Sequence, residues 1–506
     1  MKKILSLTLA LLLVVGMFAA CSSKPADSTT PEASGTTAEA DTPTDSNDTA
    51  ETEEPVEIVW YVKGAEPNHY EEVMAAFNEK ALADINMTLD LRFISDGDYN
   101  TKMQMAMAGG DDWDLCFTAH WSNNYAAAAG KGAYLELTPE MLQEYAPDVM
   151  ATIPEFMWDG LKISGKLYGL LNYQVMYTEP GFMFNSEAVE GSGLDLSTIT
   201  DYDSLLEAFK LLAETYPDKF ATRGFGPSTP YAMFRDAEMS MVMAYPWLGF
   251  NPDTQKIEPN YFFDDAITIE FFEIAQACRE LGLQPADAAT LKDENTLING
   301  GQMLSRYNAM KPGTEADLKA ARGIDFDVIS MGPRTVTTTQ VQSTITAVNV
   351  NSQHPEKAIQ MYNYVFSNAE AANILFWGLE GQDYELVDGR VQQLPDCWVA
   401  SQWQLGNQFN AMLTVNNEEG VWEETMENNA AAQPDVLFGF IPNRDPIETE
   451  LATCEAIWTE YKDILYYGLK DYTEVVPEMM EKMQLAGLDK VVAELQTQVD
   501  AFLAAK

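Results

Sequence analysis

Histidine and basic residues are scarce in this sequence. It has three histidines, His69, His120 and His354, and no two of them have the spacing of metal ligands, so we expect neither a metal nor another cofactor. Lysine and arginine number 30 against 78 aspartates and glutamates, which gives a net charge of −48. Because such a charge repels polyanions, we expect no nucleic-acid partner.

Cysteine is also rare. The 506 residues contain five cysteines and no CxxC pair, which argues against zinc and thioredoxin-like sites. One of them is Cys21, and the others are Cys116, Cys278, Cys397 and Cys454. These four have apolar neighbours, which favours buried free thiols over the alternative of one disulfide among them, but the sequence does not decide between the two.

Signatures of catalysis are missing as well. The sequence has no GxSxG elbow, no phosphate-binding loop and no GxGxxG after a predicted strand. Glu380 and Asp383, or Asp111, Asp112 and Asp114, resemble glycosidase carboxylates, but so many acids create accidental pairs. We therefore expect no enzyme.

The first residues have the pattern of a secretory signal. Lys2 and Lys3 precede an apolar run over 4–15, and Ala19-Ala20 stand directly before Cys21. This resembles the lipobox of bacterial lipoproteins, although Phe18 replaces the usual leucine. We expect a signal peptide over 1–20 and a lipidated Cys21. Residues 21–54 then form an acidic, disordered linker, so the protein is anchored on the outer, extracellular face of the membrane.

After the linker, strands and helices alternate. Strands are predicted over 56–62, 87–94 and 113–118, with helices over 70–82 and 99–108 between them, which indicates an α/β fold with a parallel sheet. In such sheets, ligands bind at the carboxyl ends of the strands. Here those ends are residues 61–64 and 118–124.

The rest of the chain predicts a second α/β region and a helical end. Residues 169–185 are extended, helices follow at 203–212, 266–281 and 291–299, and strands follow at 302–306 and 326–330. A long crossover strand is predicted over 333–349, and Pro355 begins a helix. An apolar stripe from Leu488 to Phe502 predicts a terminal helix.

Several aromatic residues lie beside Asn, Gln, Glu or Gly rather than in apolar runs. A sugar presents C–H faces to flat rings and hydroxyls to planar polar groups, so these residues suit a saccharide. They are Trp121, Tyr173, Tyr177, Trp247, Trp377, Trp398 and Trp403.

Several segments resemble the family 1 extracellular solute-binding proteins of bacterial ABC importers. They are residues 110–115 (GDDWDL), 129–137 (AGKGAYLEL), 165–170 (GKLYGL), Phe184-Asn185 and 355–358 (PEKA). Three later segments resemble a Gram-positive subgroup that has an additional C-terminal segment and is associated with sugar transport. These are residues 377–384, 406–409 and 485–496.

The resemblance implies a two-lobed, periplasmic-binding-protein-like (type II) α/β fold with hinge crossover strands and C-terminal helices. It places the first lobe at 55–172 and 338–400, the second at 173–337 and 401–445, and the C-terminal helical segment at 446–506. The lobes of a monomer would close on a small solute, most simply a mono- or oligosaccharide, and deliver it to an ABC permease. The residues expected to bind the ligand are Tyr61, Lys63, Trp121, Asn123, Tyr173, Trp377, Glu380 and Trp403.

Three alternatives remain open at this point. A surface-anchored glycoside hydrolase would need two carboxylates about 5.5 Å or 6.5–9.5 Å apart beside the aromatic cleft. A binding protein for peptides or other polar solutes would have few stacking aromatics. A sensor subunit would pass ligand occupancy to a receptor.

Overall fold

The computed structural model describes residues 54–226, 233, 240–291 and 294–506. The predicted signal peptide, Cys21 and all of the linker except Glu54 lie outside the described residues. In the part of the chain that is described, no helix combines the length and the apolar character needed to cross a membrane.

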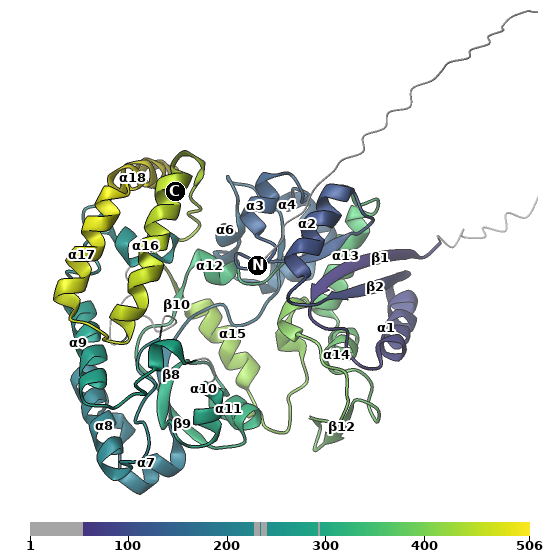
Figure 1. Ribbon diagram of the computed structural model, residues 1–506. Helices are drawn as coiled ribbons and strands as arrows, with labels where there is room; N and C mark the ends of the chain where they lie inside the picture. Colours follow the sequence, from purple (N-terminus) through teal and green to yellow (C-terminus); the bar gives the residue numbers. More distant parts are fainter. Residues whose placement is uncertain (1–53, 227–232, 234–239, 292–293) are drawn as a thin grey trace, which may run out of the picture. The chain divides into compact units, whose positions relative to one another are not determined.

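The first lobe is built on a five-stranded sheet in the order β2-β1-β3-β11-β4 (Figure 1). β1 pairs in parallel with both β2 and β3, as predicted, and β11 runs antiparallel to β3 and β4. Helices cover the sheet, so its strands read as apolar runs. The strands are β1 (Val56–Lys63), β2 (Met87–Ile94), β3 (Leu115–Thr118), β4 (Leu170–Leu171) and β11 (Ile345–Val348).

Short helices and one hairpin complete the first lobe. Proline at the first helical position begins three of the helices, where its missing N–H has no cost. The helices are α1 (Tyr70–Ile85), α2 (Tyr99–Gly109), α3 (Tyr125–Gly130), α4 (Pro139–Tyr145), α5 (Pro147–Thr152), α6 (Met157–Leu161), α13 (Pro355–Ser367), α14 (Ala369–Trp377) and α15 (Val421–Ala431). The hairpin consists of β12 (Tyr384–Val387) and β13 (Arg390–Gln393).

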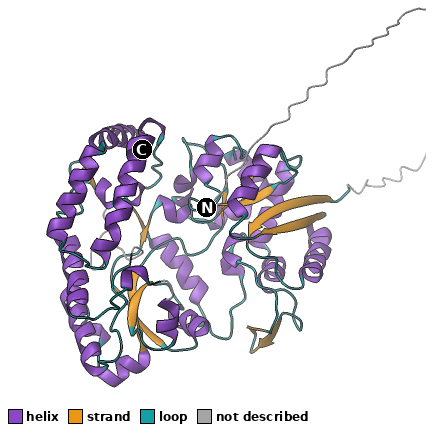
Figure 2. Ribbon diagram, viewed as in Figure 1, coloured by secondary structure: helices purple, strands orange, loops and turns teal. Residues whose placement is uncertain are grey.

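The second lobe has a separate hydrophobic core around a three-stranded sheet in the order β8-β5-β9. Both pairings in this sheet are antiparallel. Figure 2 shows its strands as a group apart from the first sheet. The strands of this sheet are β5 (Pro180–Asn185), β8 (Ser305–Ala309) and β9 (Phe326–Ser330). The lobe also contains a short hairpin of β6 (Phe250–Asn251) and β7 (Lys256–Ile257). The helices are α7 (Ser186–Ser192), α8 (Tyr202–Thr215), α9 (Ala266–Glu280), α10 (Glu294–Asn299) and α11 (Thr314–Arg322).

Three chain segments connect the two cores side by side. Thr178 and Thr335 exchange backbone hydrogen bonds of 2.9 and 3.0 Å, and β10 (Thr335–Val336) pairs in parallel with β14 (Gln433–Pro434). The long strand predicted over 333–349 is instead broken by α12 (Thr338–Val341). The reason is local: Thr337 and Gln340 form a capping box, which begins a helical turn.

The segment 401–445 packs largely on the first lobe rather than, as predicted, on the second, although Leu437 is buried in the second core. Leu405, Phe409 and Ala432 are buried in the core of the first lobe, not the second. Backbone hydrogen bonds fix this placement, because Tyr173 N–H donates to the Gly406 carbonyl and Gln408 N–H donates to the Tyr173 carbonyl.

The C-terminal helices pack on the second core. α16 (Glu448–Tyr466) contacts α9, α17 (Tyr472–Leu485) and α18 (Leu488–Ala505), and Figure 1 shows the three C-terminal helices as one group. The predicted apolar stripe is present in α18, where Leu488, Val491, Leu495 and Val499 are buried.

All four cysteines in the described residues are free, as the sequence favoured. Cys116, Cys278 and Cys454 are buried, and Cys397 is partly exposed. Burial raises the pKa of the Cys454 thiol to about 11, and it raises the pKa of Cys116 and Cys278 further. These three thiols are therefore structural and unreactive.

Candidate functional site

An aromatic cluster stands at the carboxyl end of the first sheet. Trp121, in the loop after β3, is 45% exposed, and its ring centroid lies 6.1 Å from that of Trp403. Both rings pack against Phe117, and the Lys63 ammonium lies 4.9 Å from the centroid of Trp121. Lys63 ends β1 and Trp121 follows β3, so the parallel strands bring them to one edge.

Hydrogen bonds to the backbone hold this cluster in place. The Gln404 amide accepts from Lys63 N–H and donates to the Lys63 carbonyl, at 3.0 and 2.7 Å. Trp121 Nε1 donates to the Ser343 carbonyl at 2.9 Å, and the Thr344 hydroxyl donates to the Trp403 carbonyl at 2.7 Å. The two tryptophan rings therefore form a pre-organised surface.

Sequence neighbours of Trp121 help to line a cavity of about 480 Å³, which we call the hinge hollow. The first lobe contributes His120 and Asn124, next to Trp121. The second lobe contributes Met243 and Ala244, two consecutive non-glycine residues with φ of 59° and 58°. Backbone held in this left-handed region costs free energy and is concentrated at functional sites. The remaining lining residues are Ala126, Met241, Val242, Tyr245, Thr337, Thr338, Thr339, Gln342, Asp435, Leu437, Phe440, Ile441, Pro442 and Arg444.

A second cavity, of about 700 Å³, is the one we call the hairpin hollow. Gln402, next to Trp403, forms part of it, and Trp377 lies in its wall. Trp377 is 8% exposed, and its Nε1 has no hydrogen-bond partner among the described residues. The second lobe contributes Lys311, Asp317, Ala320 and Ala321, and the first lobe adds Val391, Gln392, Gln393, Gln408, Thr414, Val415, Asn416, Asn417 and Trp422.

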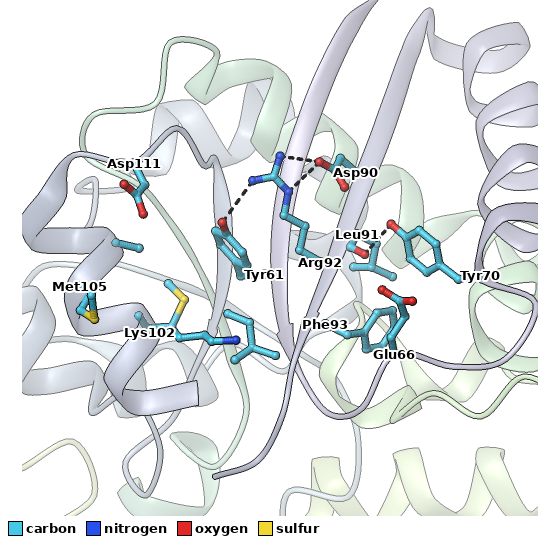
Figure 3. Close-up of a pocket in the computed structure, with 13 residues that line it drawn as sticks. Tyr61, Glu66, Tyr70, Asp90, Leu91, Arg92, Phe93, Lys102, Met105 and Asp111 are labelled. Atoms are coloured by element: carbon cyan, nitrogen blue, oxygen red, sulfur yellow. Dashed lines mark hydrogen bonds and ion pairs between the residues drawn. The ribbon is translucent and has the colours of Figure 1, made fainter. Parts of the chain in front are cut away.

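Of the eight residues expected to bind ligand, the structure brings Lys63, Trp121 and Trp403 together and places Trp377 in the hairpin hollow. The other four lie elsewhere. Tyr61 lines a different cavity, beside α2, where Arg92 donates to its hydroxyl at 3.2 Å (Figure 3). Glu380 lies in the turn before β12, away from both hollows.

Asn123 and Tyr173 are interior residues. The Asn123 amide is 5% exposed and donates to the Phe117 carbonyl and the Tyr134 hydroxyl, at 3.2 and 3.0 Å. Tyr173 is 3% exposed, and its ring packs edge-on against Phe409 with the centroids 4.9 Å apart. Both side chains are therefore interior in this structure, and neither is exposed at the aromatic cluster.

The sequence interpretation missed several lining residues. Asn124 is the neighbour of the chosen Asn123, and the difference between them is local: Asn123 points into the core, whereas Asn124 caps α3 at the surface. The glutamine and asparagine residues of the hairpin hollow come from four short stretches of sequence. Their density in 392–417 was the available signal.

Two lobes that are joined by three crossing segments, with hollows lined from both lobes, define a cleft-type ligand-binding protein. Comparison with known protein families supports this class of protein. The model of the bacterial extracellular solute-binding protein family matches residues 68–372, and a domain of unknown function (DUF3502) matches residues 436–504. The chain belongs to the bacterial extracellular solute-binding protein family.

Individual relatives cover nearly the whole chain. A carbohydrate ABC transporter substrate-binding protein of Streptococcus pneumoniae is 26% identical over 472 residues, which are 88% of this chain and 91% of that protein. The crystal structure of the N-glycan transport solute binding protein NgtS from the same species is similar with a TM-score of 0.78 at 24% identity, covering 89% of this chain and 99% of that one. Its complex with Man5GlcNAc has a TM-score of 0.65 at 25% identity, covering 90% and 99%.

Proposed function

We propose that this protein captures an uncharged oligosaccharide outside the cell and delivers it to an ABC permease. One observation carries the proposal: the paired rings of Trp121 and Trp403, the first of them exposed, adjoin in sequence the residues of two hollows that are each lined from both lobes. Sequence neighbours link the three parts, because His120 adjoins Trp121 and Gln402 adjoins Trp403. A ligand that extends from the tryptophan pair into both hollows would contact both lobes, and closure would bury it.

The lining chemistry suits a saccharide. Tryptophan faces receive the C–H faces of sugar rings, and the amides of Gln402, Gln408, Asn416 and Asn417 offer donors and acceptors to hydroxyls. The printed descriptions of the relatives name a carbohydrate and an N-glycan, which supports the same class of ligand. Two separate hollows, each lined from both lobes, favour several sugar units over one.

Export by the signal peptide and anchoring through a lipidated Cys21 are part of the proposal. The acidic linker would let the folded lobes reach a permease in the same membrane. We propose a monomer as the working form.

A binding protein fits the two hollows better than a glycoside hydrolase does. Hydrolysis of a glycosidic bond uses a pair of carboxyl groups on either side of the bond. Among the described residues, Asp317 is the carboxyl in the wall of one hollow and Asp435 that in the other. Asp114 and Asp383, two of the acids considered above, are buried; Asp114 accepts a hydrogen bond from one backbone N–H, and Asp383 accepts from two.

The charges around the cleft indicate a neutral ligand. Lys63 bonds Asp96 at 2.6 Å, Lys311 bonds Asp317, and Arg444 bonds both Glu448 and Glu455. Every lysine and arginine that the described residues place at the cluster and the hollows thus already faces a carboxylate. A ligand carboxylate would be buried beside these acids without a cation of its own, which is costly.

We therefore expect the purified protein to bind Man1GlcNAc or Man5GlcNAc at least about tenfold more tightly than the same glycan carrying sialic acid, a difference of about 1.4 kcal/mol. Titration calorimetry measures both affinities, and chromatography of the recovered glycan tests for cleavage. Absence of glycan binding across a neutral panel would overturn the proposed function, as would cleaved product.

His120 should make binding weaker in acid. The surrounding protein partly desolvates its imidazole and lowers its pKa below the usual 6.5, so the neutral form is favoured above that pH. A bound ligand would remove more water and strengthen this preference. Affinity should therefore be constant above pH 6.5 and fall below it.

The measurement is titration calorimetry at pH 7.5 and pH 5.5. The His120→Asn variant should lose most of the difference between the two affinities. His354→Asn, away from both hollows, should keep the wild-type pH dependence. Equal pH dependence in all three proteins would exclude His120 as the cause.

A further inference from the structure

The C-terminal segment of unknown function contributes to the hinge hollow. The matched domain begins at residue 436, and Leu437, Phe440, Ile441, Pro442 and Arg444 line that hollow. Residues 437–444 are therefore part of the cleft wall, and the helices α16–α18 follow directly behind them in the chain.

The start of the segment is fixed in the first lobe. The Phe438 ring lies 5.9 Å from the Phe156 ring and is buried in the first core. A side chain at Gly160 would approach Phe438 to 2.8 Å, so Phe438 sits directly on α6. Gly439 N–H donates to the Thr338 hydroxyl at 2.8 Å. Since α16–α18 pack on the second core, the segment contacts both lobes while it lines the cleft.

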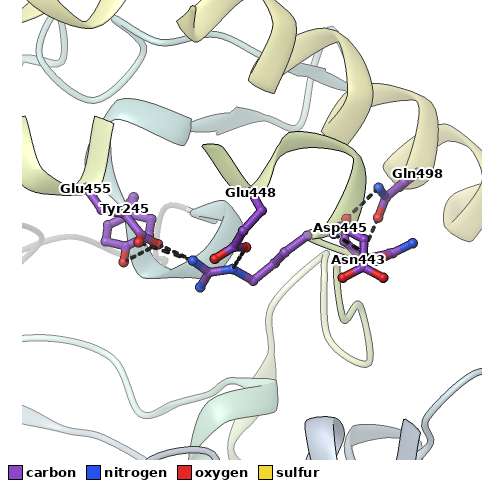
Figure 4. Close-up of polar contacts among 7 residues, drawn as sticks. Tyr245, Asn443, Asp445, Glu448, Glu455 and Gln498 are labelled. Atoms are coloured by element: carbon purple, nitrogen blue, oxygen red, sulfur yellow. Dashed lines mark hydrogen bonds and ion pairs between the residues drawn. The ribbon is translucent and has the colours of Figure 1, made fainter. Parts of the chain in front are cut away.

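The helices hold the cleft wall from behind. The Gln498 side chain on α18 accepts from Asn443 N–H at 2.7 Å and donates to the Asn443 carbonyl at 2.9 Å (Figure 4). The Phe440 ring packs against Phe502 of α18, with the centroids 5.4 Å apart. Residues 440–443 therefore depend on α18 for their position.

A network on α16 joins the two sides of the hinge hollow. Glu455 accepts from Arg444 Nη2 at 3.0 Å and from the Tyr245 hydroxyl, also at 3.0 Å (Figure 4). Arg444 Nε donates to Glu448 at 3.2 Å. Tyr245 directly follows the left-handed Met243 and Ala244, so Glu455 anchors the strained backbone of the second lobe as well as the arginine.

The guanidinium keeps donors for a ligand. Among the described residues, no acceptor lies on Arg444 Nη1, and Arg444 lines the hollow. A guanidinium has five N–H donors, and its two carboxylate partners occupy Nε and Nη2. Because those carboxylates also balance its charge, Nη1 suits a sugar hydroxyl rather than an anion.

We infer that the C-terminal segment is a part of the ligand site: Arg444 Nη1 donates to a hydroxyl of the bound glycan, and Glu455 is the positioning residue that holds Arg444 and Tyr245. This inference rests on the proposed function for its ligand. The anchoring role of Glu455 does not, because it concerns the free protein.

The test uses the full mature protein and two measurements. Arg444→Gln should weaken the binding of Man5GlcNAc about tenfold or more, because a charge-assisted donor is lost. Glu455→Gln should increase amide hydrogen exchange in residues 241–245 of the ligand-free protein and weaken glycan binding, and Tyr245→Phe should reproduce the exchange effect with a smaller change in affinity.

Lys490→Gln is the matched control. It removes an ion pair between α18 and Glu450 of α16, and neither of these two residues lines the hinge hollow. It should change neither measurement. Wild-type affinity in Arg444→Gln would overturn the ligand contact, and unchanged exchange in Glu455→Gln would overturn the anchoring role. If the wild-type protein binds no glycan while Glu455→Gln still increases exchange, the proposed function and the Arg444 contact fail, and the anchoring role stands.

Discussion

Replacing both Trp121 and Trp403 by alanine should abolish most of the glycan affinity without unfolding the protein. Both rings pack on Phe117 at the edge of the first core, where Trp121 is exposed and Trp403 is partly buried. Burying a large apolar side chain against a ligand contributes about 1.5–3 kcal/mol, so the double variant should lose about a hundredfold or more in affinity. Titration calorimetry with Man5GlcNAc measures the loss.

Two controls distinguish loss of stacking from loss of structure. Trp121→Phe keeps an aromatic face and should retain most of the affinity, although it loses the hydrogen bond to the Ser343 carbonyl. Arg92→Ala changes the separate cavity beside α2 and should bind as the wild type does. If the double variant keeps both its melting temperature and its affinity, the tryptophan pair is not the sugar platform.

The fold was largely predictable from the sequence because its signals are local. The parallel arrangement of β1, β2 and β3 follows from alternating apolar runs and helical faces, and the start of α13 follows from Pro355. The packing of 401–434 on the first core was not predictable. It depends on backbone hydrogen bonds between Tyr173 and residues 406–408, which are distant in sequence and leave no mark in side-chain pattern.

The candidate site was predictable only where strand topology decides it. Lys63 and Trp121 lie together because the carboxyl ends of neighbouring parallel strands must meet. Whether a polar residue in such a loop faces the ligand or the core depends on backbone angles: φ of 45° turns Asn123 inward, to the Phe117 carbonyl. Arg444 and Tyr245 were not predicted because their link is Glu455, and Tyr245 and Glu455 lie 210 positions apart in the sequence.

For Asp383 and Glu380, too, the sequence did not show which side chain faces the core. The difference between them leads to the second prediction, a large loss of stability. Both are acids in one turn, but Asp383 is fully buried and accepts hydrogen bonds from Leu379 N–H and Trp398 N–H at 2.9 and 2.7 Å. It also contacts the imidazole Nδ1 of His69 at 2.7 Å, so it joins the start of α1 to the segment after α14. Removing it leaves these buried donors without an acceptor.

Asp383→Ala should therefore lower the free energy of unfolding by about 2–5 kcal/mol, because two buried backbone donors lose their acceptor at about 1–3 kcal/mol each. Glu380→Ala, three residues away and with an exposed side chain, should stay within about 1 kcal/mol of the wild type. Urea denaturation of both variants measures the two losses of stability.

Equal small losses in the two variants would mean that water or a rearranged turn replaces the carboxylate. Equal large losses would mean that the turn itself, rather than the buried carboxylate, carries the stability. The predicted difference requires a rigid turn around Asp383, so that its hydrogen-bond donors stay unpaired in the variant. The close packing at Gly378 supports such rigidity, because a Cβ added there would lie 2.3 Å from the Asp383 carboxylate.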